Sequence, residues 1–389
     1  MKKSIFLVLL ILSLFTVTFA ESIDKNTEII DEYVKIYGEK IQDGIDMIES
    51  RDMDAAIPKF SAEQLLSDIS KGKNILSIGE ILSRLLELLL AEIRNTMRIL
   101  VFIPAIAVLN TYITGMQSNF QMKGAAQAAF FVCYTVMAGI AATAFFEVVR
   151  CGQGVIENIS VFMRIMMPIS LASLASSGAV ISATTFEIVL VSVIEITEAM
   201  VEKLFLPMVM AATALNVANN MSQTINAEKL VQLINKTVKW GLGIMLTLFV
   251  GITGIQGIAT STADGLTVKL TKFATSNLIP MVGGILAETV ETVMNCSVAI
   301  KNSVGILGII AVIGIAIVPV IKVAACLILF RLCAALIQPI SDERCVKCIS
   351  ELGDSVSSVL AMAVAVVVMF VIILTIIINI SNSAILLGR

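Results

Sequence analysis

After residue 80 the chain consists mainly of long apolar runs separated by short charged or polar stretches. A transmembrane helix needs about 20 apolar residues, and most of the runs reach or exceed that length. The pattern therefore predicts an all-α, polytopic membrane protein, with a transmembrane domain over residues 81–389. Eight runs stand out, at about residues 99–116, 125–146, 160–182, 186–218, 240–260, 277–296, 303–338 and 357–380.

Two of these runs are too long for one perpendicular helix. The run at 186–218 contains several charges and Pro207, and the run at 303–338 contains Pro319 and Lys322. Each predicts either a broken helix or a tight pair of spans. For the first run the pair is favoured, because the positive-inside rule then places one basic loop in the cytoplasm together with Lys123; its lysines are Lys229, Lys236 and Lys239.

The N-terminus has the order of features that defines a secretory signal peptide. Two lysines precede thirteen mostly apolar residues, and small side chains follow. We expect residues 1–20 to be the signal, with cleavage after Ala20. Thirteen helical residues rise only about 20 Å, too little to cross a hydrocarbon core of about 30 Å, so an uncleaved anchor is disfavoured.

Residues 21–80 differ from the rest of the chain. They hold 14 Asp and Glu residues against 7 Lys and Arg and no long apolar run, which predicts a small, acidic, helical extracytoplasmic segment. From residue 75 to 98 charged side chains then recur every three, four or seven residues, typical of one face of a helix. This spacing predicts an interfacial amphipathic helix leading into the first span; its charged residues are Glu80, Arg84, Glu87, Arg94 and Arg98.

Composition excludes most catalytic functions. Hydrophobic residues make up 57% of the chain, charged residues 15%, and histidine is absent. Without histidine there is no Ser-His or Cys-His dyad and no Cys/His zinc site, and no phosphate-binding P-loop motif occurs. We expect no enzymatic activity, no cofactor and no metal, so any nucleotide energy must come from a partner protein. The CVKC motif at 345–348 has no second cysteine pair, and a juxtamembrane turn is favoured over a metal site.

Ionisable residues inside the apolar runs are the sharpest functional signal, because a charge facing lipid is costly unless it lines a water-filled route or is paired. Glu195, Lys322 and Arg331 lie deepest and are the candidate functional charges. Lys322 and Arg331 are nine residues apart and are expected on opposite sides of a straight helix. For Glu147 and Arg164 we favour helix-end residues that reach the headgroups. The remaining candidates are Glu187 and Glu288.

Glycines gather at two places. Gly251, Gly254 and Gly257 recur every three residues and predict a face for close helix packing. The IPMVGG sequence, with Pro280, Gly283 and Gly284, predicts either non-helical backbone at membrane depth or a kink.

The second half of the chain resembles a known family. KLTKFATSNLIPMVGGILAETVETVMNCSVAIKNSVGILG at 269–308 and PVIKVAACLILFRLCAALIQPISDERCVKCISELGDS at 319–355 are similar to the signature half of the stage III sporulation protein AE family. Signal peptide, acidic segment and multiple spans fit the same family. The matching positions, which the resemblance makes candidate family-motif backbone positions, are Pro280, Gly283, Gly284, Lys301, Asn302, Gly305, Pro319, Lys322, Pro339 and Asp342.

This resemblance implies a membrane component of a secretion-like channel complex that links mother cell and forespore in an endospore-forming bacterium. It further implies synthesis in the mother cell, insertion into the membrane around the forespore and a role after engulfment. The implied partners are other proteins of the stage III sporulation A operon, including a cytoplasmic ATPase and ring-forming proteins, and a forespore partner protein. From the residues alone, a secondary transporter of a small solute and a purely structural anchor stay open.

Overall fold

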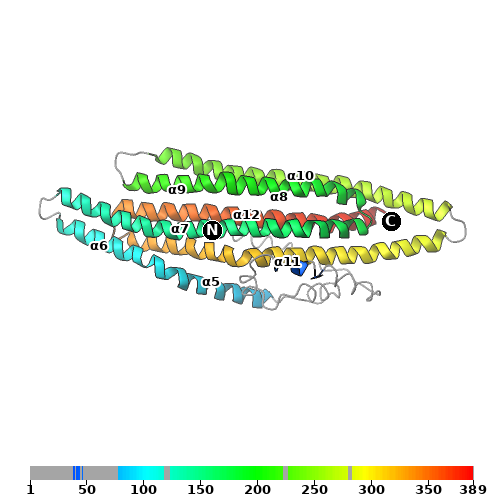
Figure 1. Ribbon diagram of the computed structural model, residues 1–389, viewed down its shortest axis with the longest axis horizontal. Coiled ribbons are helices and arrows are strands. Elements are labelled where there is room, and N and C mark those ends of the chain that lie inside the picture. The colour runs from blue at the N-terminus through cyan, green and yellow to red at the C-terminus, as the bar shows by residue number, and fades with distance from the viewer. Residues whose placement is uncertain are drawn as a thin grey trace.

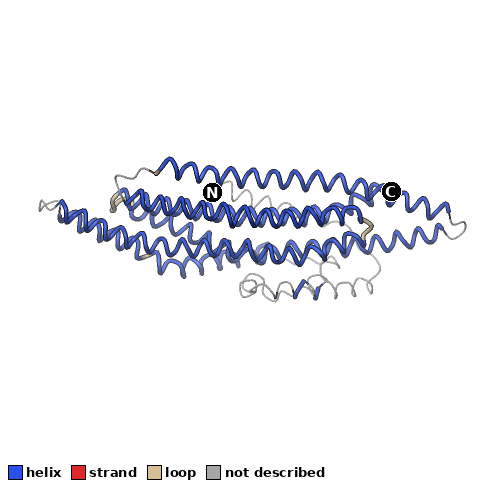
Figure 2. Tube along the Cα trace, turned by 45° about the horizontal axis from the view of Figure 1, so that its top comes forward, coloured by secondary structure: helices blue, strands red, loops and turns tan. Residues whose placement is uncertain are grey.

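The computed structural model describes residues 38–39, 41–43, 46, 78–117, 123–221, 227–278 and 283–388, and these described residues contain helices and turns but no strand (Figure 2). The expected all-α fold is therefore confirmed for this part of the chain. The elements are α5 (Ile78–Leu100), α6 (Phe102–Gln117), α7 (Lys123–Ser176), α8 (Val180–Met200), the π-helix η1 (Val201–Phe205), α9 (Leu206–Met221), α10 (Glu228–Leu278), α11 (Gly283–Ile337) and α12 (Glu343–Gly388).

The helices lie side by side along the long axis of an elongated bundle (Figure 1). Helices α7, α11 and α12 pack against one another in its interior, α8–α9 and α10 lie along one side, and α5–α6 lie along the opposite side. The core between them is mainly apolar, with some buried polar side chains and two buried charged ones among the described residues.

Five described helices are long and apolar enough to cross a membrane, at 127–176, 180–221, 228–270, 294–337 and 343–380. The eight separate runs predicted from the sequence are therefore wrong in number. Residues 125–146 and 160–176 both lie in α7, and residues 283–296 and 303–337 both lie in α11. The short stretches between them carry no proline, the residue that most strongly disrupts a helix interior.

These helices are longer than a bilayer requires. With a rise of about 1.5 Å per residue, the 54 residues of α7 extend about 81 Å. The hydrocarbon core is only about 30 Å thick, so one perpendicular crossing leaves more than half of α7 beyond the lipid chains.

The favoured pair of spans at 186–218 is also wrong, because α8, η1 and α9 form one continuous helical rod from Val180 to Met221. Pro207 has no backbone N–H to donate, which weakens the ordinary α-helical hydrogen-bond pattern at this point. The chain stays helical by widening one turn: the N–H of Leu206 donates to the carbonyl of Val201, five residues earlier. The proline therefore coincides with a π-helix instead of a reversal.

The run at 303–338 behaves in the same way, because α11 continues through Pro319 without a break. The Pro319 carbonyl accepts a weak hydrogen bond from the thiol of Cys151 on α7, at 3.6 Å. The run is thus neither a tight pair nor two separate half-helices.

The amphipathic helix expected at 75–98 is present as α5, which packs against α11. Residues 83–97 and 102–113 are together long and apolar enough for a membrane span, but a bend of 40° separates them, as in a broken span or a re-entrant loop. Location at the membrane interface stays a prediction. The signal peptide with Ala20, and nearly all of residues 21–77, lie outside the described residues.

Glycines allow the closest helix contacts. A Cβ on Gly152 of α7 would lie 2.5 Å from Val359 of α12, and one on Gly308 of α11 would lie 2.8 Å from Met166 of α7; Gly305 of α11 directly abuts Ile378. Three glycines were predicted to form one packing face. A Cβ added at Gly257 would lie close to Ile376 of α12, whereas a Cβ added at Gly251 or Gly254 would meet nothing within 4 Å.

Candidate functional site

Beyond its first residue, Lys123, helix α7 carries four charged residues, all on one face. Glu147, Arg150, Glu157 and Arg164 are spaced by three, seven and seven residues, which confines them to an arc of about 100° on a helix. All four side chains are exposed. The opposite side of α7 contributes to the apolar core, so these charges point outward from the bundle.

Helix α8 and η1 carry a second charged face. Glu187, Glu195, Glu198 and Glu202 fall within about 80° of one another at 100° per residue, and Lys203 follows directly. Glu187, Glu195 and Lys203 are exposed, whereas Glu198 and Glu202 are half-buried.

The two charged faces meet along the contact between α7 and α8. The guanidinium of Arg164 donates to the Glu198 carboxylate at 2.7 Å. Glu202 lies within electrostatic range of Glu198, Glu157, Lys203 and Arg164. We call these nine charged residues of α7, α8 and η1 the α7–α8 seam.

The centre of the seam lies at the depth of the most apolar part of the bundle. Contacts between helices give the positions along the bundle axis. Gly152 of α7 lies at the same height as Val359 of α12, and Met166 of α7 lies at the same height as Leu374 of α12, because both are next to Gly308. Glu157 and Arg164 lie between these two levels on α7. Beside them α12 has no charged residue from 355 to 388, and α11 has none from 302 to 321.

The predicted functional charges divide between different places. Glu195 belongs to the α7–α8 seam. Lys322 and Arg331 are both exposed on α11, and Arg331 forms an ion pair with Asp354 of α12 at 2.5 Å. The structure therefore does not bring Glu195, Lys322 and Arg331 together in one site. Arg164 forms an interhelical ion pair with Glu198, and its position at the headgroups stays a prediction.

Among the Asp, Glu, Lys and Arg side chains that the structure describes, two are buried inside the bundle. Lys301 of α11 is 1% exposed, and its Nζ donates to the carbonyl of Ile378 on α12 at 2.6 Å. Asp264 of α10 is also 1% exposed and accepts from the backbone N–H groups of Ile181 (2.9 Å) and Ser182 (3.0 Å) at the start of α8. Each bonds to backbone groups of another helix, so both hold helices together.

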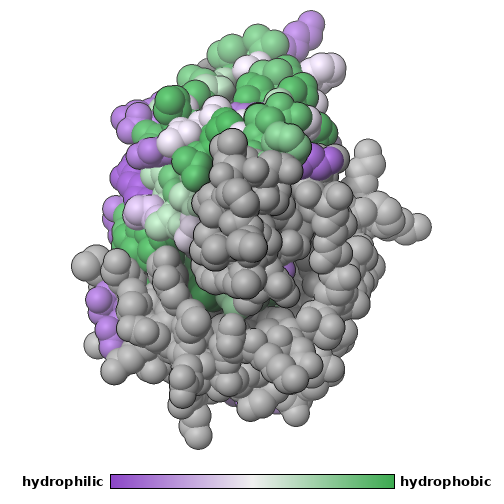
Figure 3. All heavy atoms as spheres, turned by 90° about the vertical axis from the view of Figure 1, so that its right-hand side faces the viewer, coloured by the Kyte–Doolittle hydropathy of each residue, from purple (hydrophilic) through white to green (hydrophobic). Residues whose placement is uncertain are grey.

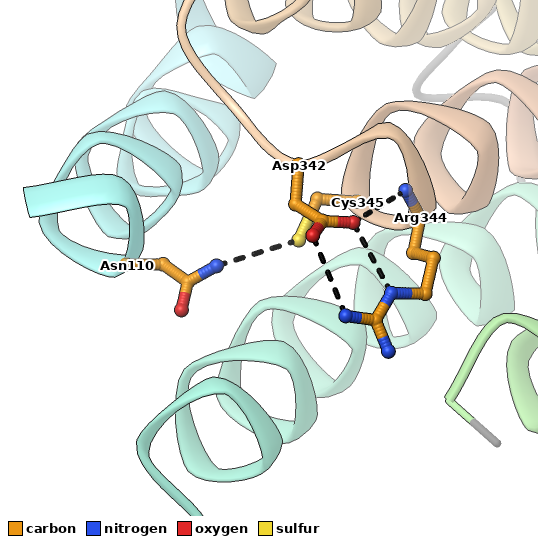
Figure 4. Close-up of polar contacts among 4 residues, drawn as sticks. All are labelled: Asn110, Asp342, Arg344 and Cys345. Carbon is orange, nitrogen blue, oxygen red and sulfur yellow. Dashed lines mark hydrogen bonds and ion pairs between the residues drawn. The ribbon is translucent and has the colours of Figure 1, made fainter. Parts of the chain in front are cut away.

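The turn between α11 and α12 is built around Asp342, directly before the first residue of α12. Its carboxylate accepts from the backbone N–H of Arg344 at 2.9 Å and from the Arg344 side chain at 3.2 Å, which caps the helix (Figure 4). Burial raises the pKa of Asp342, but the hydrogen bonds and charge of Arg344 outweigh it and hold the pKa below its ordinary value. Asn110 of α6 faces the Cys345 thiol at 3.9 Å (Figure 4).

The CVKC motif lies in the first two turns of α12 and not in a turn before it. Cys345 and Cys348 are both buried as free thiols. Arg344 also lies over the Phe130 ring of α7 at 3.9 Å, a cation–π contact. Arg344 and Cys345 at the start of α12 thus help to dock this helix against α7 and α6.

The structure places most of the other family-motif positions, and their roles stay predictions. Gly283 and Gly284 are the first two residues of α11, whereas Pro280 lies outside the described residues, so the expected irregular backbone there stays a prediction. Pro339 is exposed in the turn before α12, and Asn302 is half-buried on α11 beside Lys301.

Sequence reasoning missed the seam as a unit and missed Asp264. The heptad spacing of Arg150, Glu157 and Arg164 is a signal that would have found the α7 face. Nothing local marks Asp264 as a cap for α8, because the two are 82 residues apart and meet only through tertiary packing.

The chain is similar to known proteins of one family. The family model described as stage III sporulation protein AE matches residues 60–381. Stage III sporulation protein AE of Bacillus subtilis (strain 168) is 27% identical over 331 residues, which cover 85% of this chain and 83% of that protein. No solved structure matches the chain. The matched region contains every described helix at least in part, and the chain belongs to the stage III sporulation protein AE family.

Proposed function

We propose that this sporulation protein is a membrane subunit, without catalytic activity of its own, of a secretion-like channel complex that links mother cell and forespore. In this proposal it resides in the mother-cell membrane around the forespore. It works there with other stage III sporulation A-operon proteins, including a cytoplasmic ATPase and ring-forming proteins, and with a forespore partner protein. Its loss would stop forespore development after engulfment.

The observation that supports a subunit is the outward position of the α7–α8 seam. A charge at the centre of a bilayer costs about 2.5 to 3.5 kcal/mol by insertion measurements. Glu157 and Glu195 are exposed beside charge-free stretches of the bundle, so lipid is an unfavourable neighbour for them. Another protein, or water held between proteins, relieves this cost in an assembled complex.

A secondary transporter for a small solute is the alternative function. Such a protein binds its solute near the bilayer midplane, between discontinuous helices. In its favour, Lys301 and Asp264 are buried inside the bundle. Each of them, however, bonds to the backbone of a continuous helix.

Reconstitution separates the two functions. The purified full chain is placed in liposomes, and uptake of labelled small solutes is measured with and without an ion gradient. We expect no uptake by the single polypeptide. Gradient-driven uptake that is lost in Lys301→Met would contradict the subunit proposal and favour the transporter.

Substitutions on α11 distinguish a working subunit from a passive anchor. We expect Lys322→Ala and Arg331→Ala to abolish forespore gene activity after engulfment while the protein accumulates normally. Asp354→Ala is the matched variant for Arg331, because it removes the ion pair and keeps the cation. Full spore yield from both cation variants would favour the anchor.

A further inference from the structure

We propose that the α7–α8 seam docks a transmembrane helix of a partner protein that carries arginine or lysine at mid-membrane depth. The inference rests on the proposed function, because it names the chemistry of a partner in the complex. It concerns a surface that the bundle itself leaves uncovered.

The first step is that not every charged side chain of the α7–α8 seam has an ion-pair or hydrogen-bond partner among the described residues. Arg164 and Glu198 form the ion pair across it, and even there the side chains are 50% and 29% exposed. Glu157 and Glu195 are exposed, and among the ion pairs and hydrogen bonds of the described residues none includes either of them. Carboxylates at this depth are stabilised by pairing with a cation.

The second step is the sign of the charge. The seam holds six carboxylates, those of Glu147, Glu157, Glu187, Glu195, Glu198 and Glu202, and three cations, those of Arg150, Arg164 and Lys203. A second copy of the chain would present the same surplus of three negative charges. Like charges brought together are unfavourable, so the seam fits a basic helix better than it fits itself.

The third step is shape. The carboxylates nearest the centre lie on one narrow arc of α8 and η1, spaced by three and four residues at Glu195, Glu198 and Glu202. A helix running alongside presents its own residues at the same spacing. Arginine matches carboxylates with two parallel hydrogen bonds, so two arginines one or two turns apart would complement this arc.

The test uses defined peptides and the full chain in neutral phosphatidylcholine liposomes. The probe is a fluorescent Leu/Ala helix of about 23 residues with two central arginines seven residues apart, and the matched probe has serines at those positions. Energy transfer from the labelled protein reports binding. We expect the arginine peptide to bind at least about tenfold more tightly, which corresponds to about 1.4 kcal/mol.

The protein variants locate the binding surface. Glu195→Gln combined with Glu202→Gln is expected to abolish the preference for arginine, whereas Glu343→Gln, an exposed glutamate at the far end of α12, is expected to keep it. Circular dichroism melting confirms that each variant is folded.

Three results would overturn the inference: equal binding of both peptides, an unchanged preference in the double variant, or self-association of labelled chains that the double variant prevents. The last would assign the seam to a second copy. None of them bears on solute uptake by the reconstituted chain, so failure here is distinguishable from failure of the proposed function.

Discussion

The two halves of the bundle hold their helices together in different ways. Near the turn between α11 and α12, polar side chains bond across the interior: Tyr134 to the Val217 carbonyl at 2.8 Å, Thr213 to Ser355 at 2.8 Å and Asn220 to Glu351 at 2.6 Å. Near the turn between α7 and α8 the helices meet through glycine, as at Gly305, and two buried charges, Lys301 and Asp264, bond there to backbone groups instead of to other side chains. The charges of the α7–α8 seam lie outside, where partners can reach them.

The outer surface of the bundle also differs from place to place, because α10 exposes apolar side chains whereas the α7–α8 seam exposes charged ones. Helix α10 presents Trp240, Ile255 and Ile258 to the surroundings, each more than 70% exposed. Seen from the end where α10 and α11 lie furthest out, the described surface is largely hydrophobic with hydrophilic side chains at its margins (Figure 3). An apolar surface of this kind suits lipid, whereas the α7–α8 seam does not.

The largest effect is expected from disrupting the close helix packing in the half near the turn between α7 and α8. Gly305→Val places a side chain against Ile378, and overpacking of this kind costs about 3 kcal/mol. Thermal unfolding in detergent, followed by circular dichroism, measures the loss. Gly254→Val is the control, because a Cβ there meets nothing within 4 Å; equal losses in both variants would show that valine itself, and not the contact, is responsible.

The next effect tests the long-range cap on α8. Asp264→Ala leaves the N–H groups of Ile181 and Ser182 without their acceptor, and loss of a helix cap costs up to about 2 kcal/mol. Asp264→Asn keeps one carbonyl oxygen and should lose less. Hydrogen exchange at the start of α8 measures the change, and unaltered protection in Asp264→Ala would refute the capping role.

A smaller effect is expected in the polar half. Thr213→Val removes the hydrogen bond to Ser355 and keeps the side-chain volume, so a loss of about 1 kcal/mol follows. Thr247→Val, an exposed position bonded only within its own helix, is the matched control in the same unfolding assay. A Thr213→Val loss as large as that of Gly305→Val would erase the distinction between the halves.

The smallest effect depends on pH. Because the folded pKa of Asp342 lies below its ordinary value, its contribution to stability is present above about pH 4 and is lost as the pH falls through the folded pKa. The carboxylate is 40% exposed, so solvent screening keeps this contribution below about 1 kcal/mol. The difference in melting temperature between the wild type and Asp342→Asn should shrink from pH 5 downward; a constant difference would contradict the assignment.

The sequence was sufficient for the helical membrane class because apolar run length is a local property. It was insufficient for the number of helices, because charged residues such as Glu147 and Arg150 on one helical face leave the helix intact while lowering the local hydropathy. The broken helices or paired spans expected at Pro207 and Pro319 do not occur, since a proline inside a long packed helix is tolerated when neighbouring helices hold the backbone.

Contacts between helices could not be predicted from the sequence for a related reason. Glu195 was identified from its depth in the chain, but the ion pair between Arg164 and Glu198, which joins the two charged faces, depends on how α7 and α8 pack together. Lys301 was identified through family resemblance, and its bond to the Ile378 carbonyl depends on a helix 77 residues away.

The π-helix Val201–Phe205 has a geometric consequence for the whole rod. It holds one residue more per turn than an α-helix, which rotates everything after it by about 100°. If the rod were an uninterrupted α-helix, four residues of α9 would lie on the same face as Glu195 and Glu198 and would point outward. In the structure these four are buried: Val209, Thr213, Asn216 and Asn220. Because of this one additional residue, positions of the same helical periodicity face outward in α8 and inward in α9. Deleting the residue would rotate one helix against the other, so either α8 or α9 would expose the side that now packs in the core.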